Sequence, residues 1–305
     1  MRIRLGTRGS ALATTQSGMV AESLVAAGAR LGLEVQTELV TITTHGDISR
    51  ASLVGLSEVG VFVTALRTSL LAGECDVIVH SLKDMPTAPF EGLELAALPE
   101  REDVRDALCS GGRKLAGLPA GARVGTGSPR RTAQLLALRP DVQAVPIRGN
   151  VDTRLGMVGK ELDAVVLAAA GLNRLGRGDD AAELFDPADM LPAPGQGALA
   201  VEIAADAPEE LSNLVRSLDH ADTRAAVTAE RAALAVLDAG CSAPVGAFAT
   251  VENGALALTV RVMNTAGTLT LTEKASGRAS DAVSLGRGAA HALLGRGAAS
   301  LMGRS

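Results

Sequence analysis

Arginine residues recur where predicted strands give way to predicted helices. The chain holds 25 arginines against four lysines, and we attribute most of that excess to the codon bias typical of a high-GC genome. A helix N-terminus already carries unpaired N–H groups and a partial positive charge, so an added guanidinium there favours a bound anion. In open parallel sheets, such junctions line the crevice at the carboxyl ends of the strands. The arginines at these junctions are Arg8, Arg130, Arg131, Arg148 and Arg154.

Polar residues at the same junctions suit helix capping. Ser10, Ser128 and Asn150 each stand directly before a helical pattern, and Pro129 suits the first helical position. The turn 125–131 is rich in glycine, but it places Arg130 where a dinucleotide-binding motif has its third glycine. The sequence also lacks the lysine-containing phosphate loop of nucleotide-binding proteins. Carboxylates therefore suit these junctions as well as phosphates do.

Short β-rich runs alternate with helical patterns through the first two-thirds of the chain. This alternation predicts an α/β fold with mostly parallel sheets covered on both faces. The predicted strands lie at residues 3–5, 35–43, 76–79, 93–98, 107–110, 122–125, 142–147, 163–169 and 198–203. The predicted helices lie at 11–27, 61–72 and 129–138, with another from 151.

The last part of the chain has a different pattern. A helix at 223–239 is followed by strands at 245–251, 255–263 and 268–275, and by a helix after Ser280, which together predict an α+β module. Hinge-like stretches at 99–105 and 191–197 bound the second α/β block. The sequence thus predicts two α/β blocks and one smaller module.

Composition excludes several classes of function. A formal net charge of -5 argues against a nucleic-acid partner, and a chain with no Trp, no Tyr and four Phe cannot build stacking platforms for bases. No apolar run reaches the length of a membrane helix, and the N-terminus lacks a signal-peptide core. The three cysteines and four histidines are scattered, so we expect no metal and no disulfide framework. A reducing cytoplasm is the expected location.

Seven motifs in order resemble those of the hydroxymethylbilane synthase (porphobilinogen deaminase) family. They cover essentially the whole chain, and the ordered set is far more specific than any one motif. The motifs are GTRGSALA at 6–13, VHSLKDMP at 79–86, GTGSPRR at 125–131, IRGNVDTR at 147–154, AGLNRLG at 170–176, PGQG at 194–197 and GCSAP at 240–244.

The resemblance implies three domains. Two are α/β domains like those of periplasmic binding proteins, and the third is a small α+β domain that carries the cofactor cysteine. Domain 1 would comprise residues 1–99 and 198–218, domain 2 residues 100–197, and domain 3 residues 219–305. The family is monomeric, needs no metal or nucleotide, and carries a dipyrromethane cofactor covalently attached through a thioether. Its members add four porphobilinogen molecules stepwise to that primer, release ammonia at each step, and free hydroxymethylbilane by hydrolysis.

The resemblance also implies roles for individual residues. Cys241 would hold the dipyrromethane, and Asp84 would be the catalytic carboxylate beside Lys83, which binds a substrate carboxylate or keeps Asp84 ionised. A free cysteine is usually a small buried apolar residue, and we expect that role for Cys75 and Cys109. The positions that would hold the cofactor are Lys83, Asp84, Ser81, Thr126, Ser128, Arg130, Arg131 and Arg148. The positions that would hold substrate are Arg8, Ser10, Gln16, Phe62, Arg148, Arg154, Arg174 and Gln196.

The sequence departs from the family pattern in two places. Gly55 and Val59 occupy positions before Phe62 where many members carry lysines, which weakens any role of that loop in clamping substrate by charge. Asn173 stands where a lysine often precedes the arginine. Phe62 itself suits a core position equally well.

Two other functions compete with the enzyme. A non-catalytic, two-lobed anion-binding module would explain the arginines at the junctions but not Cys241 in an added module. A phosphate-handling enzyme built on the turn 125–131 would bind nucleotide or phosphate.

Overall fold

The computed structural model describes residues 1–42, 58–238 and 243–303, with the side chains of 58–62 left out. It divides into two compact units, Met1–Arg101 with Ala198–Arg224, and Glu102–Gly197 with Ala225–Ser305. The chain therefore leaves the first unit after Arg101 and returns to it at Ala198. The domain boundaries inferred from the family remain a prediction.

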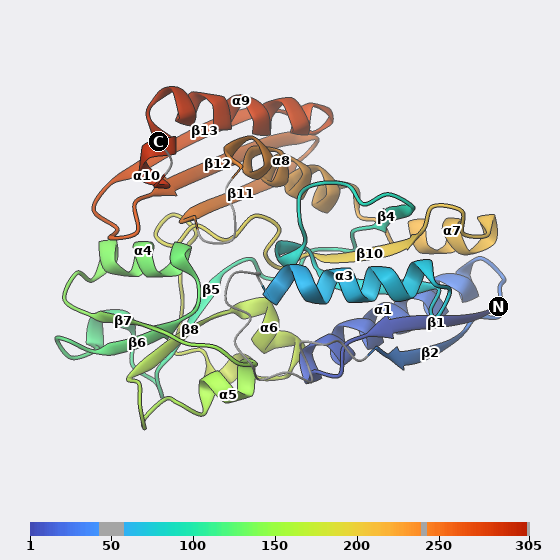
Figure 1. Cartoon of the computed structure of the whole chain (residues 1–305), viewed down its shortest axis with the longest axis horizontal. Coiled ribbons are helices and arrows are strands. Elements are labelled where there is room, and N and C mark those ends of the chain that lie inside the picture. The colour runs from blue at the N-terminus through green and yellow to red at the C-terminus, as the bar shows by residue number, and fades with distance from the viewer. Residues whose placement is uncertain (43–57, 239–242, 304–305) are drawn as a thin grey trace. The chain divides into compact units, whose positions relative to one another are not determined.

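The first unit is built on one five-stranded mixed sheet (Figure 1). Its strands lie in the order β2-β1-β3-β10-β4, with β1 parallel to β2 and β3, and β10 antiparallel to β3 and β4. The strand bounds are β1 Arg2–Thr7, β2 Gln36–Thr41, β3 Val77–Ser81, β4 Leu93–Ala97 and β10 Leu199–Ala204.

The second unit contains a sheet with the same arrangement of strand directions. Its order is β7-β6-β8-β5-β9, with β6 parallel to β7 and β8, and β5 antiparallel to β8 and β9. The strand bounds are β5 Asp106–Cys109, β6 Arg123–Thr126, β7 Gln143–Pro146, β8 Ala164–Ala168 and β9 Glu183–Leu184. Two α/β sheets of one design match the predicted pair of periplasmic-binding-protein-like domains.

The expectation of mostly parallel sheets is wrong, because half of the strand pairings in each sheet are antiparallel. The strands responsible are β10 and β5. Each follows a segment that connects the two units rather than the crossover helix of a βαβ unit, so nothing requires it to run parallel to its neighbours. A strand-and-helix pattern alone does not reveal this reversal.

Helices cover both faces of each α/β sheet, as predicted. In the first unit, apolar residues of α1 and α7 pack on one face and those of α3 on the other. In the second unit, α4 packs on one face and α5 and α6 on the other. The helix bounds are α1 Ala11–Arg30, α3 Glu58–Leu71, α4 Pro129–Leu138, α5 Val151–Leu155, α6 Ala169–Arg174 and α7 Glu209–Arg216.

The C-terminal module is an antiparallel sheet with helices on one face (Figure 1). Inward-facing residues of β11 Val245–Glu252 and β12 Ala255–Met263 form one core with α8 Ala221–Leu237 and α9 Ala282–Gly295. β13 Thr270–Arg278 completes the sheet, and α10 Ala298–Leu301 follows α9. This arrangement confirms the predicted α+β module and completes the predicted fold class.

The predicted helix caps are confirmed. The Ser10 side chain accepts from Ala13 N–H, and the Ser128 side chain accepts from Arg131 N–H directly before Pro129. Asn150 caps α5 through Thr153 N–H at 2.8 Å. Each cap satisfies an N–H that the helix itself leaves unpaired, which fixes where the chain turns from strand to helix.

A buried charge cluster stabilises the first unit. Glu202 on β10 accepts two hydrogen bonds from Arg67 on α3, at 2.7 and 2.9 Å, and its other contact is His80 Nε2 at 3.1 Å. The Arg67 guanidinium also lies 4.9 Å from the ring centroid of Phe90. Burial raises the pKa of Glu202, but the hydrogen bonds from His80 and Arg67 outweigh burial and hold the pKa below its usual value.

We expect Glu202→Gln to lower the free energy of unfolding by about 3–5 kcal/mol, because it leaves the Arg67 charge buried without its partner. The matched control is Glu94→Gln, which breaks an exposed pair with Arg216 and should cost under about 1 kcal/mol. Urea unfolding at neutral pH measures both. Since the folded pKa of Glu202 is depressed, its contribution is present above the unfolded pKa and fades as pH falls through the folded one. Equal losses in the two variants would contradict this assignment.

Candidate active site

The residues Lys83 and Asp84 lie in a tight turn directly after β3. A 3-10 turn spans Leu82–Asp84, and Ser81 ends the strand before it. The Asp84 side chain is exposed and Lys83 is half-buried. Pro86 follows the turn, so no α-helix continues from it. This turn therefore presents a carboxylate and an ammonium group at the carboxyl end of a central strand.

Other predicted residues of the first unit gather at the same sheet edge. Because β1 and β3 are parallel neighbours, Arg8 after β1 and Ser81 at the end of β3 share that edge. Gln16, in the second turn of α1, donates from Nε2 to Ser81 Oγ at 3.0 Å. The structure thus brings together two hydrogen-bonding residues that lie 65 positions apart in the sequence.

The second unit places its predicted residues at the equivalent edge. β6, β7 and β8 are mutually parallel, so the segments after them meet at one edge. Thr126 ends β6, and its Oγ1 accepts from Ser128 N–H at 3.2 Å. Arg148 follows β7 and is exposed. The half-buried arginines beyond β7 and β8 are Arg154 in α5 and Arg174 in α6.

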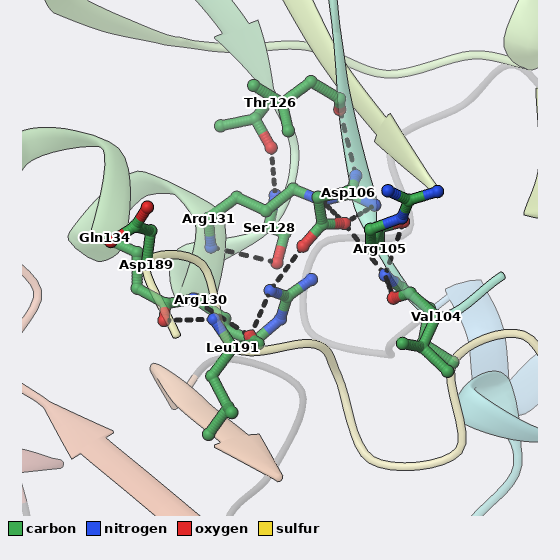
Figure 2. Close-up of polar contacts among 12 residues, drawn as sticks. Val104, Arg105, Asp106, Thr126, Ser128, Arg130, Arg131, Gln134, Asp189 and Leu191 are labelled. Carbon is green, nitrogen blue, oxygen red and sulfur yellow. Dashed lines mark hydrogen bonds and ion pairs between the residues drawn. The ribbon is translucent and has the colours of Figure 1, made fainter. Parts of the chain in front are cut away.

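Arg130 and Arg131 converge on a buried aspartate that sequence reasoning missed (Figure 2). Asp106, the first residue of β5, is 0% exposed. Its Oδ2 accepts from Arg130 Nη1 at 2.7 Å and its Oδ1 from Arg131 Nε at 2.8 Å. Arg130 also donates to the Leu191 carbonyl at 2.6 Å, and Arg131 to the Val166 carbonyl at 3.0 Å. The two adjacent guanidinium groups therefore share one carboxylate.

The neighbouring arginine charges lower the pKa of the buried Asp106 carboxyl group. Burial raises the pKa of Asp106, but the charges of Arg130 and Arg131 and the hydrogen bonds from Arg130 and Gln196 outweigh it and hold that pKa well below its usual range. Burial lowers the pKa of Arg130, although Asp106 opposes that shift. An aspartate at the start of a buried strand is a weak signal of a functional site. The sequence does not show which distant residues will contact its side chain.

Gln196 also points toward Asp106. Its Nε2 donates to Asp106 Oδ1 at 3.0 Å and to the Val104 carbonyl at 2.7 Å. Gly197 beside it has φ 89°, and a Cβ there would lie 2.4 Å from the Glu102 carbonyl oxygen. Glycine is therefore required where the two connecting segments pass each other. The motif PGQG fixes the chain as it leaves the second unit.

Glu230 ties the same turn to the C-terminal module. This buried side chain, 0% exposed, accepts from Gly195 N–H at 2.7 Å and from Ala249 N–H at 2.8 Å. One carboxylate thus joins the turn at 194–197 to β11. Sequence reasoning missed Glu230 because an acid inside a helical pattern is usually solvated.

The described donors suit a polycarboxylate such as dipyrromethane. Arg130 Nε and Arg174 Nε are buried and have no hydrogen-bond partner within the described ranges. Each of these guanidinium groups therefore has an N–H group that a ligand could accept from. Burial lowers the pKa of Arg174, with the charge of Glu102 opposing it, and an added anion would favour the charged form. Asn173, where a lysine often stands in the family, donates to Glu102 at 3.1 Å.

Some predicted residues lie outside the described part of the chain. Cys241 and Gly240 are among them, as are Gly55 and the side chains of Val59 and Phe62. Cys75 and Cys109 are buried free thiols, as expected, and burial raises the pKa of each to about 11. Across the described residues, no group of three or more His, Cys, Asp or Glu could hold a metal ion. No helix within those ranges has the length and apolar character to cross a membrane.

Two family models match the chain. Residues 3–212 match "Porphobilinogen deaminase, dipyromethane cofactor binding domain", and residues 224–295 match "Porphobilinogen deaminase, C-terminal domain". Among solved structures, a lipoprotein of the YaeC family from Enterococcus faecalis V583 gives a TM-score of 0.42 at 14% identity, over 71% of this chain and 90% of that chain.

Curated relatives cover nearly the full length. Porphobilinogen deaminase of Thermobifida fusca (strain YX) is 57% identical over 97% of this chain and 94% of its own length. Porphobilinogen deaminase 1 of Streptomyces coelicolor is 52% identical over 99% and 97%, and the Corynebacterium diphtheriae protein is 48% identical over 99% and 100%. The chain belongs to the porphobilinogen deaminase family.

Proposed function

We propose that this protein is a hydroxymethylbilane synthase, a transferase that joins four porphobilinogen molecules with loss of ammonia at each step. The observation that carries the proposal is the gathering of guanidinium and hydroxyl donors at the carboxyl-end edge of each α/β sheet, on the motifs that define the family. Each pyrrole of the substrate carries an acetate and a propionate. Repeated carboxylate sites are therefore what a lengthening product needs.

Cys241 is the proposed attachment point of the cofactor. When bound, dipyrromethane supplies a pyrrole carbon that is the nucleophile toward the first substrate. The thiol of Cys241 would hold that group by a thioether, while Cys75 and Cys109 are too buried to compete. The three-domain division proposed from the sequence would place Cys241 in domain 3.

Asp84 is the proposed catalytic carboxylate. Loss of ammonia from porphobilinogen leaves a positive charge on the pyrrole and its methylene. An ionised carboxylate near the ring N–H stabilises that charge as it develops, more strongly than it stabilises the neutral substrate. Lys83, next to it in the same turn, would bind a substrate carboxylate or favour the ionised form of Asp84.

The remaining predicted residues would hold carboxylates and keep them in register. The proposed guanidinium donors are Arg8, Arg130, Arg131, Arg148, Arg154 and Arg174. The proposed neutral donors are Ser10, Gln16, Ser81, Thr126, Ser128 and Gln196, with Phe62 proposed near the rings. A charge-assisted hydrogen bond contributes about 1.5–3 kcal/mol, so several in series can hold a polyacid in place.

We further propose a cytoplasmic monomer that binds no nucleic acid. A net charge of -5 and only four aromatic residues support the last point. Scattered cysteines support a reducing compartment. Size-exclusion chromatography with light scattering would test the monomer.

The direct test is incubation of the purified chain with porphobilinogen. The proposal requires that substrate disappear, that ammonia and a linear tetrapyrrole appear in a ratio of four to one, and that no metal or nucleotide be needed. Unchanged porphobilinogen after prolonged incubation would overturn it. Tight binding of phosphate or nucleotide without turnover would favour the phosphate-handling alternative.

Arg148→Leu should raise KM for porphobilinogen, or slow one elongation step, by about 10- to 100-fold through loss of a charge-assisted hydrogen bond. Because Arg148 is exposed, folding stability should change little. Mass spectrometry during turnover would show accumulated short intermediates. The matched control is Arg113→Leu, an exposed arginine of the same unit, which should behave as wild type. A normal set of intermediates in Arg148→Leu would show that Arg148 does not hold a substrate carboxylate.

A further inference from the structure

We propose that Asp106 is a positioning residue for the reaction: it fixes Arg130 and Arg131 side by side and leaves the pair one net positive charge for a substrate or cofactor carboxylate. The inference rests on the proposed function, because it concerns how that site holds its polyacid. Asp106 itself would touch neither substrate nor cofactor. It acts only through the two arginines.

Both guanidinium groups are fixed on one carboxylate. Oδ1 of Asp106 accepts hydrogen bonds from Arg131 Nε and from Gln196 Nε2, and Arg131 Nη2 lies 2.8 Å from the same oxygen. Oδ2 of Asp106 accepts a hydrogen bond from Arg130 Nη1. Arginine side chains have many rotamers, and two adjacent guanidinium groups repel each other. A shared carboxylate with 0% exposure removes both difficulties, so the remaining N–H groups point in fixed directions before any ligand arrives.

The cluster of Asp106, Arg130 and Arg131 carries one net positive charge. Arg130 and Arg131 are buried and bring two positive charges, while Asp106 brings one negative charge. Among the described residues, Asp106 is the one acid in ion-pair contact with this pair. A buried, uncompensated charge is unfavourable, and a bound carboxylate relieves it. Arg130 Nε, buried and without a hydrogen-bond partner inside the described ranges, is an N–H that such a ligand could use.

The cluster is attached to three separate segments of the backbone. Arg130 and Arg131 follow Pro129 in the first turn of α4, whose cap Ser128 lies at the carboxyl-end edge of the sheet. Gln196 links Asp106 to the Val104 carbonyl. One buried carboxylate thus connects the start of α4 with both segments that join the second unit to the first. This arrangement suits a fixed anchor rather than a flexible surface contact.

Asp106→Asn tests the proposal on the whole protein, with porphobilinogen as the probe. We expect KM to rise at least about tenfold, or one covalent intermediate to accumulate, at temperatures well below the midpoint of unfolding. The matched control is Asp141→Asn, which removes the carboxylate from an exposed bidentate pair with Arg139 in the same unit. The control should keep wild-type KM and intermediates. A purely structural role for Asp106 would change the melting temperature and the active fraction but not KM or the order of intermediates.

A double variant keeps the test decisive if Asp106→Asn does not fold. Asp106→Asn with Arg130→Gln removes one charge of each sign and so returns the cluster to one net positive charge. This variant should fold, and its intermediates should accumulate more abnormally than those of Arg130→Gln alone, because only the double variant deprives Arg131 of its Asp106 anchor. Wild-type KM and intermediates in either variant would overturn the proposal. An inactive wild-type chain would instead overturn the proposed function, and with it the assignment of Asp106.

Discussion

Asp84→Asn should slow ammonia release from porphobilinogen by about 10²–10³ while leaving the fold intact. Removing one preorganised group that faces developing charge typically has an effect of this size. The amide is nearly isosteric with the carboxylate, and Asp84 is exposed in its turn, so folding should tolerate the change. Single-turnover measurement of ammonia separates this step from binding and release.

Two further variants test whether the effect depends on the charge and the position of the Asp84 carboxylate. Glu91→Gln alters another exposed acid of the same unit and should leave the rate of ammonia release unchanged. Asp84→Glu keeps the charge but moves it by one methylene, so an intermediate rate is expected. Ammonia release at the wild-type rate from Asp84→Asn would show that another group stabilises the cation.

Cys241→Ser should abolish turnover and yield a chain whose mass equals that of its sequence. A serine hydroxyl ionises far less readily than a thiol, so the covalent primer would not form. Without it, the first porphobilinogen has no anchored partner. Intact-mass measurement combined with a porphobilinogen assay tests the expectation.

The other cysteines provide the control for Cys241. Cys109→Ala removes a buried thiol whose pKa burial raises to about 11, and that variant should keep both the added mass and the activity. Because Cys109 lies in the packed core of the second unit, some loss of stability is expected. Full turnover by Cys241→Ser would contradict the covalent primer.

Local signals in the sequence were enough to place most elements. Ser128 followed by Pro129 fixed the start of α4, and alternating apolar residues fixed β12, because caps and periodicity act over a few residues. The helix α6 was missed because an apolar run carries straight on from β8, and its N-cap, Ala168, makes no side-chain cap. The helix α7 was missed although Glu209 and Glu210 open its first turn.

Sequence patterns do not show which side chains far apart in the sequence contact each other. The arginines at the strand ends could be recognised as a group, but not the carboxylate that orders two of them. Asp106 lies 24 residues from Arg130 and 90 from Gln196, and only the completed sheet brings them together. The same holds for Glu202 with Arg67, 135 residues apart. The reversed strands β10 and β5 likewise depend on how the chain passes between units.

The intact mass of the purified chain tests the central claim most directly. If a covalent pyrrole primer is anchored at Cys241, the chain is heavier than its sequence by two porphobilinogen units less two ammonia molecules. Brief exposure to porphobilinogen should then add further increments of one such unit each. A chain at its sequence mass, with no increments after exposure to substrate, would contradict the account and favour a non-catalytic anion-binding module.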